Sequence, residues 1–131
     1  MVLDSSAVIA ILLDDPERET ITKAIESDPR RFMSAANLLE SAIVIEAKRG
    51  EHAGRELDLL LHRAEVEIVP FDSEQARVAI AAWRRFGKGR HPAGLNFGDC
   101  FAYALSSLTG EPVLFTGGDF AKTDVASVEL V

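Results

Sequence analysis

Short apolar runs alternate with longer amphipathic stretches along the whole chain. The short runs predict strands at residues 2–3, 31–33, 66–69, 113–115 and 128–131. The stretches between them have the spacing of helices, at residues 7–13, 16–27, 35–49, 51–63, 73–86 and 97–108. Strands separated by helices need crossover connections, which produce parallel pairing and a sheet covered on both faces. The pattern therefore predicts an α/β fold, a three-layer α/β/α sandwich with a mainly parallel, about five-stranded central sheet.

Residues that favour helix ends support these boundaries. Ser5 or Ser6 can cap the first helix. Ser34 can cap a long helix that Gly50 then ends, and Asn96 can cap the last helix. The helices are therefore expected to begin directly after the strands.

Composition narrows the class of protein. The chain has 131 residues, 47% hydrophobic and 27% charged, with no repeat or linker, so residues 1–131 are expected to form a single domain. The lone Cys100 excludes an internal disulfide and favours a reducing, cytoplasmic location. The longest apolar run near the start, residues 7–13, is too short to span a bilayer, so no membrane association is expected. Fourteen Lys and Arg residues against 21 Asp and Glu residues give a net charge of −7, which repels nucleic acid unless a local feature compensates.

Two acidic residues follow predicted strands. Asp4 comes directly after the first strand, and Asp119 comes after the fourth strand, past Gly117 and Gly118. In open α/β sheets, ligands bind beyond the carboxyl ends of the strands. Helix capping by Asp4 and turn formation by Asp119 explain the same positions. Position alone therefore leaves both roles open.

Two further acidic residues lie on predicted helices. Neighbours such as Ile43 and Ala47 place Glu40 on an apolar stripe, where a carboxylate must be paired, metal-bound or neutral. A salt bridge to a core arginine, or a side chain that reaches solvent from the stripe edge, is the structural alternative for Glu40. Asp99 falls at the third position of the helix capped by Asn96, where a carboxylate closes a capping box, yet its neighbours face inward.

Convergence of these acids on one pocket would explain all four. Carboxylates brought together without matching bases repel one another strongly. Oxygen-only ligands suit a hard divalent cation, Mg²⁺ or Mn²⁺. Such an ion can polarise a phosphoryl oxygen and lower the pKa of a bound water. We therefore expect a metal-dependent site for phosphate chemistry formed by Asp4, Glu40, Asp99 and Asp119.

Several segments carry a resemblance to a known family. They read DSSA at residues 4–7, SAANLLE at 34–40, HPAGLNFGDCFAYAL at 91–105, and LFTGGDF at 114–120 followed by TDV at 123–125. The chain resembles PIN-domain proteins, and among them the VapC-type ribonuclease toxins of bacterial type II toxin–antitoxin pairs. The long segment around Asp99 is highly specific, whereas the short motifs around Asp4 and Asp119 are weak alone. The chain departs from the commonest family pattern in its Gly-Gly turn before Asp119.

The resemblance implies a PIN-like fold and Mg²⁺-dependent endonucleolytic cleavage of RNA, in which metal-activated water attacks phosphorus. The family's acidic quartet falls on Asp4, Glu40, Asp99 and Asp119, with Asp4 and Asp99 as the main metal ligands. Ser6 and Thr116 fall where family members place hydroxyl groups beside the site. The resemblance also implies a cognate VapB-type antitoxin that blocks the acidic groove, and a homodimer.

One basic stretch interrupts the acidic composition. It consists of Arg84, Arg85, Lys88, Arg90 and His91. Arg85 and Lys88 are candidates for guiding the RNA backbone, and a solvated helix end is the structural alternative. Trp83 could stack a base, but a helix tryptophan is more often packed, so packing is expected.

Other functions fit less well. A phosphoreceiver domain would need an acceptor aspartate after a central strand, but Asp58 lies within a helical pattern. A non-catalytic PIN-like module that binds RNA or protein stays open, because the acids alone do not prove turnover. DNA as substrate is disfavoured only by analogy with the family branch.

Overall fold

The central sheet of the computed structural model, which describes residues 1–130, has four strands in the order β3-β2-β1-β4. They are β1 (Val2–Leu3), β2 (Phe32–Ser34), β3 (Glu67–Val69) and β4 (Val113–Leu114). All three strand pairings are parallel. Parallel neighbours require a crossover between each pair, and helices supply these crossovers.

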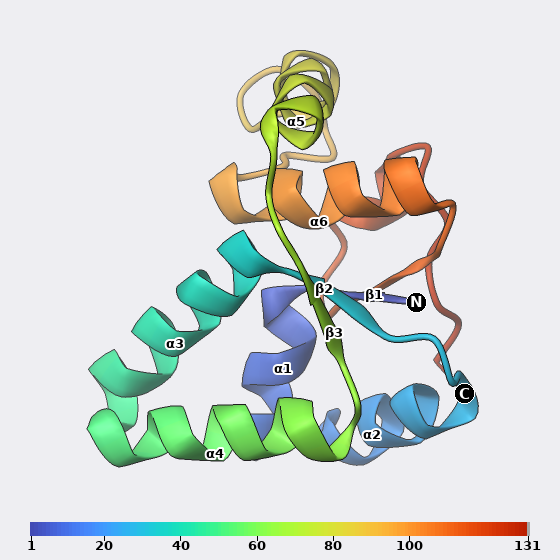
Figure 1. The fold of residues 1–131 in the computed structure, drawn as a ribbon. Coiled ribbons are helices and arrows are strands. Elements are labelled where there is room, and N and C mark those ends of the chain that lie inside the picture. The colour runs from blue at the N-terminus through green and yellow to red at the C-terminus, as the bar shows by residue number, and fades with distance from the viewer. Residues whose placement is uncertain (131) are drawn as a thin grey trace.

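Helices cover both faces of this sheet. They are α1 (Ser5–Leu12), α2 (Arg18–Ser27), α3 (Ala35–Arg49), α4 (Glu51–Arg63), α5 (Ser73–Phe86) and α6 (Phe97–Thr109), with a 3-10 turn η1 (Phe120–Lys122). Figure 1 shows α5 and α6 on one side of the sheet, and α1, α2 and α4 on the other. The expected three-layer α/β/α architecture is confirmed.

Alternate strand residues face two separate cores. Val2 and Val113 pack with residues of α5 and α6, whereas Leu3 and Leu114 pack with residues of α1, α2 and α4. Successive side chains of a strand point to opposite faces, so a sheet covered on both sides needs apolar residues at every position. This explains why the strand segments are short apolar runs without polar alternation.

The expected fifth strand is absent from the described residues. Ser127 forms a single parallel bridge to Val113, and the Val128 N–H donates to the Val113 carbonyl at 2.9 Å. The Ala126 carbonyl accepts from the Val113 N–H at 2.9 Å. The prediction of a strand at 128–131 was wrong because β4 is only two residues long and offers no further ladder. Val131 lies outside the described residues.

The start of the first two helices also differs from expectation. Asp4, rather than Ser5 or Ser6, caps α1, since its carboxylate accepts from the Ser6 N–H at 3.1 Å. The second helix begins at Arg18 instead of Pro16, after a turn in which Asp14 has a positive φ of 55°. The capping role predicted as an alternative for Asp4 is therefore realised.

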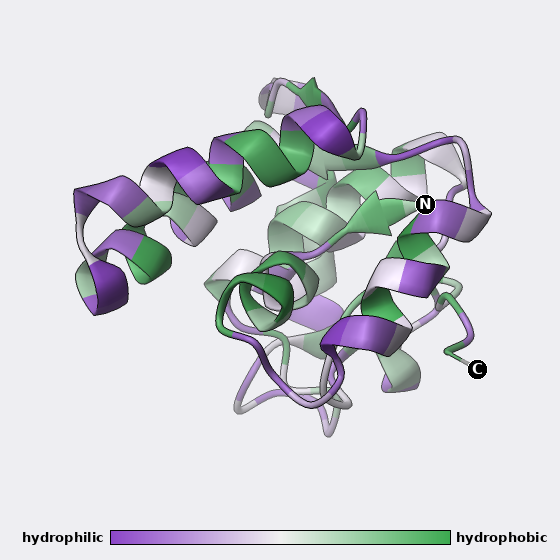
Figure 2. Ribbon diagram, turned by 90° about the horizontal axis from the view of Figure 1, so that it is seen from below, coloured by the Kyte–Doolittle hydropathy of each residue, from purple (hydrophilic) through white to green (hydrophobic). Residues whose placement is uncertain are grey.

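Hydropathy follows the layers. Figure 2 shows hydrophobic segments gathered in the middle of the molecule and hydrophilic segments at its periphery, notably along the hairpin of α3 and α4. Among residues 1–130, no helix combines the length and apolar character needed to cross a bilayer.

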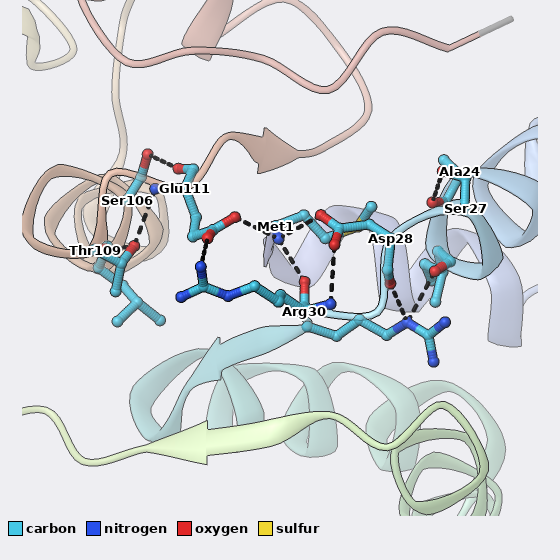
Figure 3. Close-up of polar contacts among 11 residues, drawn as sticks. Met1, Ala24, Ser27, Asp28, Arg30, Ser106, Thr109 and Glu111 are labelled. Carbon is cyan, nitrogen blue, oxygen red and sulfur yellow. Dashed lines mark hydrogen bonds and ion pairs between the residues drawn. The ribbon is translucent and has the colours of Figure 1, made fainter.

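The amino end of β1 is held by a polar network. The Met1 ammonium donates to Asp28 at 2.9 Å, to Glu111 at 3.0 Å and to the Arg30 carbonyl at 2.5 Å (Figure 3). The Arg30 guanidinium lies 3.2 Å from Glu111. The Arg30 N–H and the Met1 ammonium hold the pKa of the Asp28 carboxyl below its usual value. This network lies at the opposite end of the strand from Asp4.

Candidate active site

The predicted acids gather where the strands end. Asp4 follows β1 directly, and Asp119 lies in the loop after β4, just before η1. Glu40 lies on α3, which begins immediately after β2, and Asp99 lies in the first turn of α6. The carboxyl ends of β1 and β2 and the start of α6 meet on the left of the sheet in Figure 1. The topology thus brings four distant segments to one edge.

Asp4 is buried, with 4% of its surface exposed. Its main-chain N–H donates to the Leu114 carbonyl at 3.0 Å, so the residue is fixed between β1 and β4. Burial, and to a smaller degree the nearby Glu40 carboxylate, raises the pKa of Asp4 to about 6. The raised pKa reports a carboxylate removed from water with an acidic neighbour.

Asp99 is also buried and is held by a reciprocal cap. Its N–H donates to the Asn96 side chain at 2.9 Å, and its carboxylate accepts from the Asn96 N–H at 3.0 Å. This is the capping box expected from the sequence. Burial raises the pKa of Asp99 to about 7, with further contributions from the Asp4 charge and from a side-chain hydrogen bond with Asp119. The cap therefore orients a carboxylate that also faces two other acids.

The surroundings of the Glu40 side chain differ from the prediction. Its expected apolar stripe is wrong, because Ile43 is 59% exposed and Ala47 is exposed as well. Glu40 instead lies over buried polar residues: its Oε1 accepts from the Ser5 hydroxyl at 2.5 Å and from the Asn37 amide at 3.2 Å. The salt bridge to a core arginine is absent within residues 1–130.

Ser6 and Thr116 meet beside Asp119. The Ser6 hydroxyl accepts a hydrogen bond from the Thr116 N–H at 3.0 Å. Thr116 contributes its main chain to this contact. The bond ties the loop that carries Asp119 to the first turn of α1, next to Asp4.

Electrostatic repulsion links all four acids. Asp4 faces Glu40 and Asp99, and Asp99 faces Asp119. Within residues 1–130, no lysine or arginine forms an ion pair with any of the four. In the same range, no three His, Cys, Asp or Glu side chains are grouped closely enough to hold a metal ion as they stand. The donor set, carboxylate oxygens without a protein cation, fits a hard divalent cation.

Sequence reasoning missed three residues around Glu40. Asn37 and Ser5 bind its carboxylate, and Gly98 lies against it: a Cβ at Gly98 would lie 2.7 Å from the Glu40 carboxyl carbon. Asn37 could have been found as a polar residue one helical turn before Glu40, on the same face. Nothing in the sequence signals that Gly98 touches α3.

The residues of the basic stretch differ in their contacts. Arg85 pairs with Asp124 at 3.2 Å and its guanidinium lies 4.7 Å from the Phe86 ring centre. Arg90 lies 4.7 Å over the Trp83 ring. The packing expected for Trp83 is only partial, since 46% of its surface is exposed. Lys88 is exposed and forms no ion pair among the described residues.

An apolar groove of about 660 Å³ lies between α5 and α6. Its lining includes Phe71, Ile80, Trp83, Phe97 and Phe101, with Lys88 at its margin. Phe97 is 80% exposed, although it stands two positions before Asp99. Exposed aromatic patches of this kind are typical of interaction surfaces.

Cys100 has a structural role. The thiol is buried and donates to the Asn96 carbonyl at 3.3 Å. Burial, with a contribution from Asp99, raises the pKa of the Cys100 thiol to about 11, so it is not a thiolate at neutral pH.

Comparison with known proteins agrees with this geometry. Residues 1–126 match the PIN domain. The chain belongs to the PIN-domain family. It is 57% identical over 128 residues to Ribonuclease VapC of Mycolicibacterium smegmatis, covering 98% of this chain and 99% of the relative. It is 55% identical over 130 residues to Ribonuclease VapC30 of Mycobacterium tuberculosis, covering 99% of each. The chain is thus a PIN-domain protein of the VapC ribonuclease group, which confirms the family and the enzyme class expected from its motifs.

Solved structures confirm the fold. The crystal structure of Mycobacterium tuberculosis VapC20, a sarcin–ricin loop cleaving toxin, superposes on this PIN domain with a TM-score of 0.80 at 18% identity, covering 98% of each chain. A toxin–antitoxin complex from Klebsiella pneumoniae contains a chain with a TM-score of 0.70 at 16% identity, covering 99% of this chain and 98% of that one. The PIN-like architecture therefore persists where sequence identity is low.

Proposed function

We propose that this PIN-domain protein is a Mg²⁺-dependent endoribonuclease, the toxin of a VapBC-type module. The observation that carries the proposal is the gathering of Asp4, Glu40, Asp99 and Asp119 from four segments without a neutralising protein cation. Asp4 and Asp99 would be the main metal ligands, since both are buried and both have a raised pKa. Glu40 and Asp119 complete the acidic pocket.

Each acid has a distinct task in this proposal. A bound Mg²⁺ would polarise a phosphoryl oxygen and lower the pKa of an attacking water. Asp4 and Asp99 have little freedom to rotate, because helix caps fix both carboxylates. Asp119 sits on a loop that the Ser6–Thr116 hydrogen bond restrains. Rigid ligands of this kind hold reacting groups in place during phosphodiester hydrolysis.

The approach of RNA requires local positive charge. Lys88 is exposed and forms no ion pair among residues 1–130. We propose that it contacts a phosphate of the RNA where the RNA passes the start of α6. Arg85 shares its charge with Asp124, so its contribution to RNA binding is expected to be smaller. Mn²⁺ is expected to replace Mg²⁺, because carboxylate ligands accept both.

Cleavage of labelled single-stranded RNA tests the enzyme proposal. Wild type with Mg²⁺ should produce internal cuts, and a chelator or Asp99→Asn should abolish them. Asp58→Asn, an exposed acid on α4, serves as the matched control and should cleave normally. Equal cutting by wild type and Asp99→Asn would refute the assignment. RNA binding without any cutting would favour the non-catalytic PIN-like module instead.

A VapB-type antitoxin is the proposed protein partner. The four acids create a pocket that attracts a cationic side chain, and such a group from the antitoxin would occupy it in competition with RNA. Addition of the cognate antitoxin in equimolar amount should stop RNA cleavage. Unchanged cleavage in a stable complex would show that the antitoxin binds elsewhere.

A homodimer is proposed through the groove between α5 and α6. A twofold contact uses the same patch on both copies, so one exposed aromatic groove supplies both halves of the interface. Phe97 is its most exposed large apolar residue, at 80%. Phe97→Glu should produce a monomer by light scattering, whereas Leu108→Glu, on the same helix but outside the groove, should not. A wild-type monomer, or a dimeric Phe97→Glu, would contradict this interface.

A further inference from the structure

The two oxygens of the Glu40 carboxylate have different surroundings. Oε1 accepts two hydrogen bonds, from the Ser5 hydroxyl at 2.5 Å and from the Asn37 amide at 3.2 Å. Oε2 accepts none from the described residues. The carboxylate is therefore held by Oε1, while Oε2 lies against Gly98.

The orientation of the Asn37 amide is fixed by its neighbours. Its nitrogen donates to Glu40 Oε1 and, at 3.0 Å, to the main-chain carbonyl of Gly98. Both partners are acceptors, so the reversed amide would place oxygen against oxygen. Asn37 is completely buried, and its Oδ1 has no hydrogen-bond partner. A buried amide that leaves one atom unpaired costs stability, which indicates that its donor end is what the site uses.

Ser5 supports the same carboxylate from another helix. Its hydroxyl has one proton and lies 2.5 Å from Glu40 Oε1 and 3.2 Å from the Asn37 carbonyl. The shorter contact, to a carboxylate, is the stronger one. Glu40 is thus held between α1 and its own helix, α3.

Gly98 closes the arrangement from α6. A Cβ at Gly98 would lie 2.7 Å from both the Glu40 carboxyl carbon and Oε1, and would collide with Oε2. Glu40 can occupy its place only because residue 98 lacks a side chain. The main-chain carbonyl of the same glycine accepts the Asn37 amide, which ties α3 to the turn that carries Asp99.

We propose that Asn37 and Ser5 are positioning residues that hold Glu40 by Oε1, with Oε2 in the space left by Gly98, so that the carboxylate is fixed beside Asp4. The proposal deepens and rests on the proposed ribonuclease function. It assigns a role to Asn37, whose buried side-chain amide donates to Glu40 and to the Gly98 carbonyl at the start of α6.

A double-mutant cycle tests this assignment. Asn37→Ser removes the amide and should lower cleavage by about 10- to 100-fold, the usual effect of losing a group that orients a ligand. In a Glu40→Ala background the same change should cause no further loss, since Asn37 acts through Glu40. Ser41→Ala is the matched control and should cleave normally: its hydroxyl is buried on α3 and donates to the main-chain carbonyl of Asn37 at 2.8 Å, with no hydrogen bond to Glu40.

Gly98→Ala tests the position of the same Glu40 carboxylate by adding a methyl group from α6. Alanine favours a helix more than glycine does, and the colliding group is the end of a flexible side chain. The protein should therefore still fold, while cleavage falls by about 10-fold or more. Again, no further loss is expected when Glu40 is alanine.

Mn²⁺ binding, followed by the electron paramagnetic resonance of the free ion, gives a readout independent of turnover. Asn37→Ser and Gly98→Ala should weaken Mn²⁺ binding in the Glu40 protein and leave it unchanged in Glu40→Ala. Losses of cleavage or Mn²⁺ binding that are equal in both backgrounds would overturn the positioning role. If wild type cuts no RNA, the proposed function fails, while the Mn²⁺ cycle still decides whether Asn37 acts through Glu40.

Discussion

The Ser6 hydroxyl accepts a hydrogen bond from the Thr116 N–H at 3.0 Å, although 110 residues separate them in sequence. Ser6 lies two positions after Asp4, and Thr116 three positions before Asp119. Together with the hydrogen bond from the Asp4 N–H to the Leu114 carbonyl, this bond sets the spacing of two acidic segments. Beyond it, the loop that leads to Asp119 contains two exposed glycines, Gly117 and Gly118, which do little to restrain it.

Ser6→Ala should loosen this loop. Loss of the bond is expected to cost about 1 kcal/mol of unfolding free energy and to lower RNA cleavage several-fold, because Asp119 is no longer restrained. Hydrogen exchange should become faster at Thr116 and in the residues after it. Ser107→Ala, an exposed serine on α6, should change none of these quantities. Unaltered exchange at Thr116 in Ser6→Ala would contradict the role of the bond.

The raised pKa values of Asp4 and Asp99 predict how stability depends on pH. Both lie above the ordinary value of 3.8, at about 6 and about 7. Their contribution to stability is fully present below 3.8 and is lost as pH rises through these folded values. In a chelator, the melting temperature should therefore be lower at about pH 7.5 than at about pH 5.

Asp99→Asn isolates the share of Asp99. Asparagine can still accept the Asn96 N–H, so the helix cap is kept, but the buried charge is gone. The difference in melting temperature between the two pH values should shrink, and Mg²⁺ should stabilise the variant less than it stabilises wild type at about pH 7.5. If the melting temperature of Asp99→Asn depends on pH as strongly as that of wild type, Asp99 is not the source of the pH dependence.

Arg85 and Lys88 should differ in their contribution to RNA binding. Lys88→Glu should weaken RNA affinity and reduce the slope of log affinity against log salt by about 1, as expected for one lost phosphate contact. Arg85→Glu should change the slope less, because Arg85 already pairs with Asp124, and should instead lower the melting temperature by placing two acids together. Fluorescence anisotropy with labelled RNA in an Asp99→Asn background measures both slopes. Equal slopes for wild type and Lys88→Glu would exclude Lys88 as a phosphate contact.

Tyr103 should anchor the segment after η1. Its hydroxyl donates to the Asp124 carboxylate at 2.5 Å, and burial together with this acceptor raises the pKa of Tyr103 to about 12. Tyr103→Phe should cost about 1.5 kcal/mol in chemical denaturation, since one partner is charged. Hydrogen exchange should rise around Asp124 and stay constant in α3. Protection that is unchanged around Asp124 would show that the segment is held by other contacts.

The architecture could be predicted largely because each strand and helix has a local signal. The capping box of Asn96 and Asp99, the Gly50 terminus and the apolar strand runs each depend on neighbouring residues only. The predicted fifth strand, which residues 1–130 do not form, shows the limit: pairing near Ser127 depends on β4, which lies outside the local sequence pattern and is only two residues long. Strand length is set by tertiary packing, which a local pattern does not contain.

The acidic site, too, could be predicted from the sequence only in part. Asp4 and Asp119 were located by their place after strands, which topology alone brings together. The apolar stripe predicted around Glu40 does not exist, since Ile43 is exposed, and the resemblance to the family is what identifies Glu40 from the sequence. Its true surroundings, Ser5 and Asn37, are contacts between helices and have no signal in the spacing of residues along the chain.

The position of β4 in the sheet has a consequence for synthesis of the protein. A nascent chain that has left the ribosome as far as α5 contains Asp4 and Glu40 but lacks β4 and α6. Strand β1 then has only β2 beside it, and Asp99 and Asp119 have not yet emerged. The acidic site proposed here needs residues from both sides of this point, so a nascent chain without α6 and β4 holds only part of it.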